Sequence, residues 1–218
     1  GITSRLSLVQ TDTSDGKDRP EDWIAQRAHA LSIHADHLAL ATAAWEAWRA
    51  PAPVAWFELL SRDLGRLPQL RNTRIALLEE LPSRTTGLGA TEMQMLARLA
   101  AGYTRPYDLI PRHDRPNDRV TYGLWEAGAL LDALARCAPP AVSGLTEGPF
   151  DRELHVSEER LARYENSTLS LTDLGKAILA GEDDFSDHNP IHRWWGGTEL
   201  TNDRLWRWDP TNRRLGAP

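Results

Sequence analysis

The sequence predicts a mainly α-helical protein: a layer of helices, then a smaller α+β domain, then a tryptophan-rich β-hairpin at the C-terminus. Apolar residues recur every three or four positions in several segments, which is the spacing of a helix with one buried face. Proline or glycine ends most of these segments. Four of the nine tryptophans lie between residues 189 and 215, in two runs typical of strands.

Residues 1–31 predict one strand and one short helix. Apolar and polar residues alternate over 6–10, as in a strand, and a turn-rich segment follows to residue 20. The apolar residues of 21–31 fall on one helical face. Because the strand has no neighbour nearby in the sequence, we expect residues 1–20 to be the remnant of a missing N-terminal α/β domain. Such a remnant would be poorly packed or paired with another molecule.

We assign residues 21–87 to a helical domain. Beyond its first short helix, it is expected to hold helices over 37–49, 53–60 and 69–81. The apolar stripe of the first of these consists of Leu38, Ala41, Trp45 and Trp48. Proline, which suits the first turn of a helix, stands near the start of the other two.

We assign residues 88–181 to a second domain with a mixed pattern. Helices are expected over 91–101, 122–137 and 172–180, and short strands near 142–145 and 168–171. The stretch 103–120 is expected to be a loop, and 147–163 to be partly helical.

Local signals indicate where two of these helices begin and end. Thr91 with Gln94 three residues later predicts a capping box, and Gly102 closes that helix. Thr172 is expected to be the N-cap of the last helix, and Gly181 its C-terminal cap.

We assign residues 182–218 to a tryptophan-rich hairpin tail. Two strand-like runs, 193–195 and 205–208, flank Gly196-Gly197, and one terminal hairpin is the simplest interpretation. Alternation along a strand would place indoles on one face and guanidinium groups on the other. Trp194 and Trp195 are adjacent, so one should be buried and the other exposed, and Trp208 should be buried.

This tail contains the candidate ligand or partner surface. Its residues are Arg193, Trp194, Trp195, Gly196, Gly197 and Arg207. Aromatic walls, glycines that allow close backbone approach, and arginines suited to an anion would together form a pocket. The alternative is that the tryptophans only pack the hairpin onto the helices.

Charge and composition disfavour several classes of function. The formal net charge is −6 and no segment is basic, so duplex DNA and membrane surfaces are not expected as partners. No apolar run is long enough to span a membrane, and the lone Cys137 fits a reducing compartment. Of the 25 basic residues, 23 are arginine, which indicates a GC-rich bacterial genome. We therefore expect a cytoplasmic bacterial protein.

No catalytic, metal or cofactor motif is recognised. The acidic and histidine residues of 183–192 lack the spacing of an established metal site, and we interpret them as solvated or capping residues. Gly87-Leu-Gly89 lacks the third glycine of a dinucleotide fingerprint. Cys137 has no neighbouring histidine, and no serine lies in a nucleophile elbow. The expectation is no cofactor, no metal and, on balance, no catalysis.

One motif resembles the winged-helix fold. The sequence Leu171-Thr-Asp-Leu-Gly175 through Leu179 is similar to the wing strand and final helix of that fold, and the similarity covers about residues 91–181. This resemblance implies DNA binding through the helix at 122–137. That helix, however, carries Glu126 and Asp132 against Arg136, whereas readers of the major groove present basic or amide side chains.

A broader resemblance covers most of residues 33–209. Its matching segments are Trp45-Glu-Ala-Trp-Arg-Ala-Pro-Ala-Pro53, Leu67-Pro68, Leu81-Pro-Ser83, Gly87-Leu88, Thr91-Glu92, Leu171-Thr-Asp-Leu-Gly175, Ala180-Gly181, Arg193-Trp194, Gly196-Gly197 and Trp206-Arg-Trp-Asp209. They resemble the bacterial family known as domain of unknown function 1835. The resemblance implies a preceding α/β domain, of which residues 6–10 would be the last strand, and implies no activity or catalytic residue.

Three functions therefore remain open. The first is a non-catalytic regulatory or interaction protein that binds a protein partner or a second copy of itself. The second is an enzyme or ligand sensor with an anion-binding site at the Arg/Trp/Gly-Gly tail. The third is a transcriptional DNA-binding protein, which the acidic helix disfavours.

Overall fold

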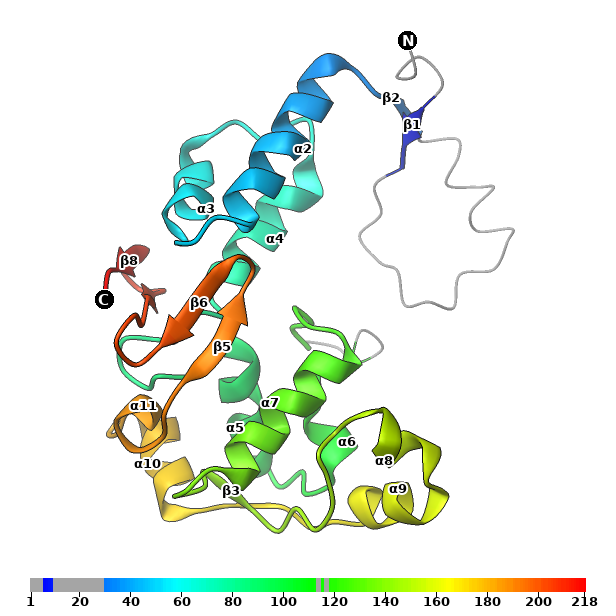
Figure 1. Cartoon of the computed structure of the whole chain (residues 1–218), viewed down its shortest axis with the longest axis vertical. Helices are drawn as coiled ribbons and strands as arrows, with labels where there is room; N and C mark the ends of the chain where they lie inside the picture. The colour runs from blue at the N-terminus through cyan, green and yellow to red at the C-terminus, as the bar shows by residue number, and fades with distance from the viewer. Residues whose placement is uncertain (1–5, 10–29, 113–114, 116–117) are drawn as a thin grey trace. The chain divides into compact units, whose positions relative to one another are not determined.

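Helices predominate in the computed structural model, which describes residues 6–9, 30–112, 115 and 118–218 (Figure 1). The α-helices are α2 (Ala35–Trp48), α3 (Val54–Glu58), α4 (Pro68–Leu78), α5 (Ala90–Ala100), α6 (Pro106–Leu109), α7 (Leu124–Arg136), α8 (Arg152–Val156), α9 (Glu158–Glu165), α10 (Asp173–Ala180) and α11 (Phe185–His188). A 3₁₀ helix, η3 (Leu59–Ser61), follows α3. The prediction of a mainly α protein is confirmed. None of the helices described has the length and apolar character needed to cross a membrane.

The strands are short and pair two by two. They are β1 (Ser7–Leu8), β2 (Leu31–Ser32), β3 (Val142–Ser143), β4 (Ser170–Leu171), β5 (His192–Trp195), β6 (Thr198–Thr201), β7 (Arg207–Asp209) and β8 (Arg214–Gly216). In the middle of the chain β3 and β4 run antiparallel, with Val142 opposite Leu171. The two strands predicted there are confirmed.

The expected strand near the N-terminus does have a partner in the same chain. Ser7 pairs with Ser32 and Leu8 with Leu31 in an antiparallel ladder between β1 and β2. The expectation that this strand has no partner is therefore wrong. The helix predicted over 21–31 also does not reach Leu31, because Leu31 is the first residue of β2. A strand of two residues is too short to show the alternation of apolar and polar side chains by which strands are recognised in a sequence. Residues 21–29 of the predicted helix lie outside the described residues.

Contacts divide the chain into two compact units. Unit 1 comprises Gly1–Leu78 and Trp194–Glu199, and unit 2 comprises Glu79–Arg193 and Leu200–Pro218. The units therefore do not follow chain order, because the tip of the β5–β6 hairpin belongs with the first 78 residues. Within unit 1, α3 contacts both α2 and α4 (Figure 1), and the side chains of Trp56, Leu59 and Leu64 are buried.

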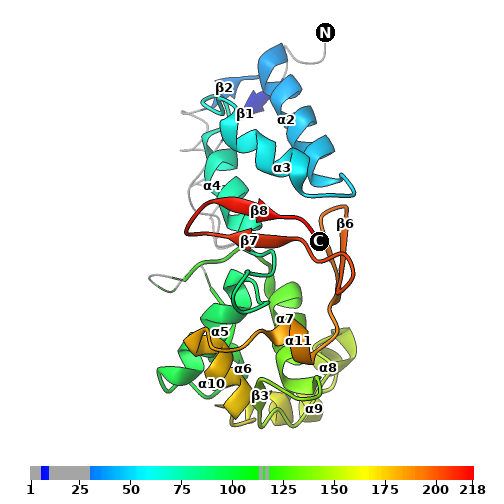
Figure 2. The ribbon, with the colours of Figure 1, turned by 90° about the vertical axis from the view of Figure 1, so that its left-hand side faces the viewer.

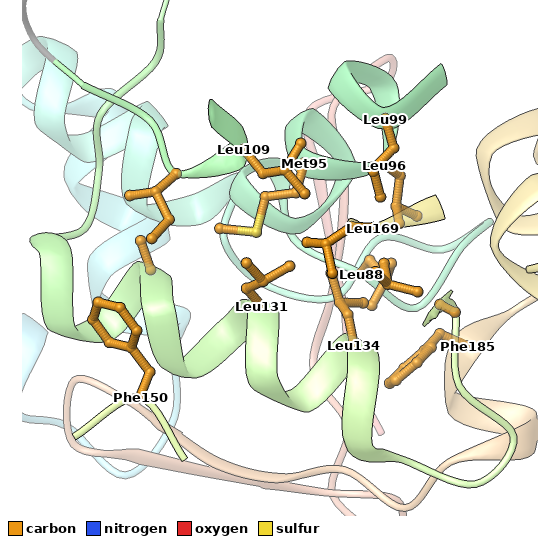
Figure 3. Packing of buried hydrophobic residues seen from close by; sticks show 14 of the residues in the cluster. Leu88, Met95, Leu96, Leu99, Leu109, Leu131, Leu134, Phe150, Leu169 and Phe185 are labelled. Carbon is orange, nitrogen blue, oxygen red and sulfur yellow. The ribbon is translucent and has the colours of Figure 1, made fainter. Parts of the chain in front are cut away.

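The core of unit 2 forms where α5, α6, α7 and α10 meet β3 and β4. Leu131 and Leu134 of α7 point toward Met95 and Leu96 of α5, and all four side chains are fully buried (Figure 3). On α7 the packed face repeats at helical spacing through Ala127, Leu131 and Leu134, and on α5 the neighbouring residues Met95 and Leu96 both enter the core.

The end of α10 confirms its predicted caps, whereas the start of α5 differs. The hydroxyl of Thr172 accepts a hydrogen bond from Gly175 N, and Gly181 adopts a left-handed conformation at the end of α10. Helix α5 instead begins after Gly89, whose N–H donates to the carboxylate of Glu92 at 2.8 Å. The predicted capping box at Thr91 is wrong because its hydroxyl donates to Glu80, on the preceding segment.

Two other predictions need correction. The stretch 103–120, predicted as a loop, contains the single-turn helix α6, which is too short to show a repeating apolar stripe. The C-terminal tail forms two hairpins rather than one, β5–β6 and β7–β8 (Figure 2). The two tryptophan-rich runs are the first strands of separate hairpins, because each pairs with the less aromatic segment that follows it.

Candidate functional site

The Gly196-Gly197 turn packs against the end of α2 within unit 1. The N–H of Gly197 donates to the carbonyl of Trp48 at 2.9 Å, and the hydroxyl of Thr198 donates to the carbonyl of Ala50 at 3.2 Å. A Cβ atom on Gly197 would lie 2.0 Å from the carbonyl oxygen of Arg49. The glycines thus allow the turn to donate hydrogen bonds to carbonyl groups that the end of a helix leaves without partners. The space beside the glycines, which the sequence suggested for a ligand, is filled by the backbone at the end of α2.

Trp195 and Trp194 have opposite environments, as the sequence predicts for adjacent strand residues. Trp195 is 2% exposed and its indole N–H donates to the carbonyl of Leu77 at 2.7 Å. Its ring meets Trp48 edge to face, with centroids 4.7 Å apart. Trp194 is 65% exposed, which makes it a surface tryptophan of unit 1.

Arg193 belongs to a network of buried charged groups in unit 2. Its Nη1 donates to Glu92 Oε2 at 2.9 Å, and that oxygen also accepts from Gly89 N. Glu80 accepts from both the N–H and the hydroxyl of Thr91, at 3.1 and 2.8 Å. The Nη2 atom of Arg193 is buried without a hydrogen-bond partner. The buried carboxylate of Glu92 is therefore paired with Arg193, and the buried Glu80 lies near enough to the same guanidinium group to interact with its charge.

Burial governs the titration of this network. It raises the pKa of Glu80 above its ordinary value, although the hydrogen bonds from Thr91 oppose the shift. The pKa of the Tyr122 hydroxyl is also raised, first by burial and then by the negative charge of Glu80. Burial alone would lower the pKa of Arg193, but Glu92 raises it above its usual range. The network has the character of a structural clamp, because Glu80 and Glu92 are only 2% and 3% exposed.

Arg207 forms a second clamp in unit 2. Its Nη1 donates to the carbonyl of Ser83 and to Asp184 Oδ2, each at 2.7 Å, and its Nη2 donates to Ser186 Oγ at 2.6 Å. A polar cavity of about 280 Å³ lies beside it, lined in part by Asp187 and Asp203. The guanidinium of Arg207 is poorly suited to binding an anion, because it already donates to three acceptors within the chain and because the cavity beside it is lined in part by carboxylates.

The predicted tail residues are thus divided between two settings. Trp194, Trp195, Gly196 and Gly197 lie in unit 1, whereas Arg193 and Arg207 lie in unit 2. Trp208 is 2% exposed, which confirms its predicted burial. Arg193 pairs with Glu92, 101 positions earlier in the chain, and Arg207 pairs with Asp184, which lies within the tail itself.

The acidic and histidine residues of 183–192 are engaged with one another and with the chain. Asp183 Oδ1 lies 2.8 Å from His188 Nε2, and Asp184 caps α11 and pairs with Arg207. Among the residues that the structure describes, no group of three or more His, Cys, Asp or Glu side chains could hold a metal ion.

An apolar groove of about 480 Å³ lies in unit 1 between α2, α3 and α4. Its lining residues are Ala41, Ala44, Trp45, Trp48, Trp56, Leu67, Gln69, Leu70, Thr73 and Leu77. None of them is charged, and the hydroxyl of Thr73 already donates to the carbonyl of Gln69. Trp45 is 61% exposed at its edge. The groove suits an uncharged apolar group.

The outward face of α7 is the second exposed feature of functional interest. Leu124 and Trp125 are 44% and 48% exposed at its first turn. Ala129 and Ala133 are exposed further along, and Glu126 and Arg136 lie near the two ends. This face is uncharged in the middle and carries one charge of each sign at its ends.

Comparison with known proteins gives no match. No family model, curated protein or solved structure is similar to this chain. The resemblances to the winged-helix fold and to domain of unknown function 1835 stay predictions.

Three features of these sites escaped the sequence reasoning. Glu80 and Glu92 look like ordinary surface acids of a helical segment, and their burial depends on the return of β5 to α5. The groove depends on the angle between α2 and α4. The exposed apolar surface of α7 also escaped it, because Leu124 has the helical spacing of the buried residues Ala127, Leu131 and Leu134 and yet is 44% exposed.

Proposed function

We propose that this protein is a non-catalytic interaction protein, and that the exposed face of α7 in unit 2 binds another protein rather than DNA. The observation that carries the proposal is the composition of that face: the half-exposed indole of Trp125, followed on the same side of the helix by the exposed alanines Ala129 and Ala133. Exposed aromatic residues are enriched at protein interfaces. Trp125 is held rigidly, because its ring packs against Phe150 and His155 with centroids 5.7 and 4.6 Å apart.

The order of elements in unit 2 supports a winged-helix-like scaffold. Helices α5, α6 and α7 are followed by β3 and β4, which pair antiparallel and lead into α10. In such a scaffold α7 takes the place of the recognition helix. A pair of helices, α8 and α9, stands between β3 and β4 where a winged-helix protein has its wing.

Several basic side chains of unit 2 are engaged within the chain, which reduces the number available to bind phosphates. Arg98 pairs with the buried carboxylate of Asp118, and Arg115 donates to the carbonyl of Asp108 at 2.8 Å. Arg105 donates to the carbonyl of Asn166, and Arg119 pairs with Glu79. Affinity for duplex DNA depends on arginine and lysine side chains that are available to neutralise phosphates.

Two measurements test this proposal. Fluorescence anisotropy with a labelled duplex should show no binding tighter than about 10 µM at physiological salt. A photo-cross-linking amino acid at position 129 should capture a protein in extract of the source organism, whereas the same group at position 176, on the exposed side of α10, should not. Duplex binding with a steep salt dependence, or equal capture at both positions, would contradict the proposal.

The groove in unit 1 favours a second candidate, a sensor for a small apolar ligand. Its volume of about 480 Å³ and its aromatic lining suit an uncharged aromatic molecule. The test is titration with a neutral fluorescent naphthylamine, with Trp45→Ala as the variant and Trp194→Ala as a control tryptophan. Binding that survives Trp45→Ala unchanged would rule out this groove.

A further inference from the structure

We propose that α7 packs antiparallel against α7 of a second copy of this chain, forming a two-fold symmetric dimer. The inference rests on the proposed function and names the partner as the protein itself. It is carried by the self-complementary pattern of the exposed residues on this helix.

Four exposed residues form one stripe along α7. Glu126, Ala129, Ala133 and Arg136 follow one another at intervals of three, four and three residues, which keeps them on one side of the helix. In an antiparallel pair centred on position 131, Ala129 faces Ala133 of the second copy and Glu126 faces its Arg136. The two-fold axis repeats both contacts with the roles of the two copies exchanged, as an isologous interface requires.

Size and charge both fit this registration. Alanines at the centre allow two helix axes to approach to about 8 Å, the short end of the usual range for packed helices. Two reciprocal ion pairs between Glu126 and Arg136 would close the ends of the contact. Arg136 is available for this because its side chain is 42% exposed and its bond to Asp132 is long, at 3.4 Å.

One exposed aromatic side chain borders the stripe. Trp125, which is 48% exposed, lies one turn before Ala129 on the same side of α7. One helix pair buries less surface than the roughly 1,200 Å² typical of stable complexes. The dimer is therefore weak and depends on protein concentration.

Sedimentation velocity of the full chain, over about a hundredfold range of concentration, tests this geometry. Glu126→Arg and Arg136→Glu should each weaken the dimer about tenfold or more, because each places like charges together twice. The double variant Glu126→Arg/Arg136→Glu should restore it. Glu158→Arg, the same charge change in the first turn of exposed α9, should have no effect, and thermal melting by circular dichroism verifies that each variant is folded.

A chain that stays monomeric at every concentration overturns the proposal, as does a dimer that both single variants leave intact or that the double variant does not restore. A monomeric chain whose position 129 still cross-links a different protein would leave the proposed interaction function standing and eliminate the self-association alone. Binding of duplex DNA would instead contradict the proposed function itself.

Discussion

Arg193 Nη1 lies 2.9 Å from Glu92 Oε2, although the two residues are separated by 101 positions in the chain. The pair connects β5 to the first turn of α5, where Glu92 also accepts the N–H of Gly89. Because Glu92 is nearly inaccessible to water, its charge depends on this arginine for compensation. Four predictions follow from this clamp and from the close backbone contacts of the fold.

Arg193→Met should lower the free energy of unfolding by about 2 kcal/mol, because it leaves the buried carboxylate of Glu92 without its ion-pair partner. The figure is at the low end for a buried pair, since the arginine side chain keeps 25% of its surface exposed. Chemical denaturation measures the change. Arg152→Met, which removes an exposed arginine on α8, is the control and should cost less than about 0.5 kcal/mol. Equal effects of the two substitutions would refute the clamp.

Glu80→Gln should make the free energy of unfolding fall less steeply as pH rises. Burial raises the pKa of Glu80 in the folded state, so its protonated form favours folding, and its contribution falls as pH rises above the ordinary value of 4.5. Glutamine cannot ionise and can still bond to Thr91. The stability of the variant relative to the original protein should therefore increase between about pH 5 and about pH 7.5 in urea denaturation. A relative stability that stays constant or decreases would contradict the assignment.

Gly175→Ala should destabilise unit 2 by about 2 kcal/mol or more. The added Cβ would lie 2.1 Å from the carbonyl oxygen of Ala141, so α10 could not keep its position beside β3. Gly181→Ala is the comparison, because no atom lies within 4 Å of its added Cβ and only its left-handed backbone resists the change. That variant should cost about 1 kcal/mol. If Gly175→Ala proved the milder of the two in thermal denaturation, the close approach would be wrong.

Gly197→Ala should loosen unit 1 around its tryptophan cluster. The substitution would force the hairpin tip away from the Arg49 carbonyl, and with it Trp195, whose ring contacts Trp48 and Trp56. We expect a red shift of tryptophan emission and a loss of about 1–3 kcal/mol. Gly65→Ala, whose added Cβ would approach only the side chain of Asp63, serves as the matched control. An emission spectrum that does not differ from that of the control would count against the tip being held by α2.

Sequence reasoning was most successful where the interactions are local. The boundaries of α7 and the caps of α10 follow from side-chain spacing and from single residues such as Thr172 and Gly181. It was less successful for β1 and β2, whose two-residue ladder is too short to produce a recognisable alternation. It also joined the two tryptophan-rich runs into one hairpin, because composition does not specify which segment a strand pairs with.

The sequence by itself determined helices α2, α4, α5, α7 and α10, because their hydrogen bonds join residues four positions apart and local apolar spacing, proline and glycine mark their extent. It likewise determined that α7 carries no cluster of basic side chains, because Arg136 stands against Glu126 and Asp132. Only the tertiary structure decided that Arg193 meets Glu92, that Gly197 covers the end of α2, and that Trp194 is exposed while Trp195 is buried. These contacts join segments about 100 residues or more apart in the chain, or depend on which side of a strand meets the core. Their partners are therefore set by how the elements pack against one another, and no local pattern encodes that.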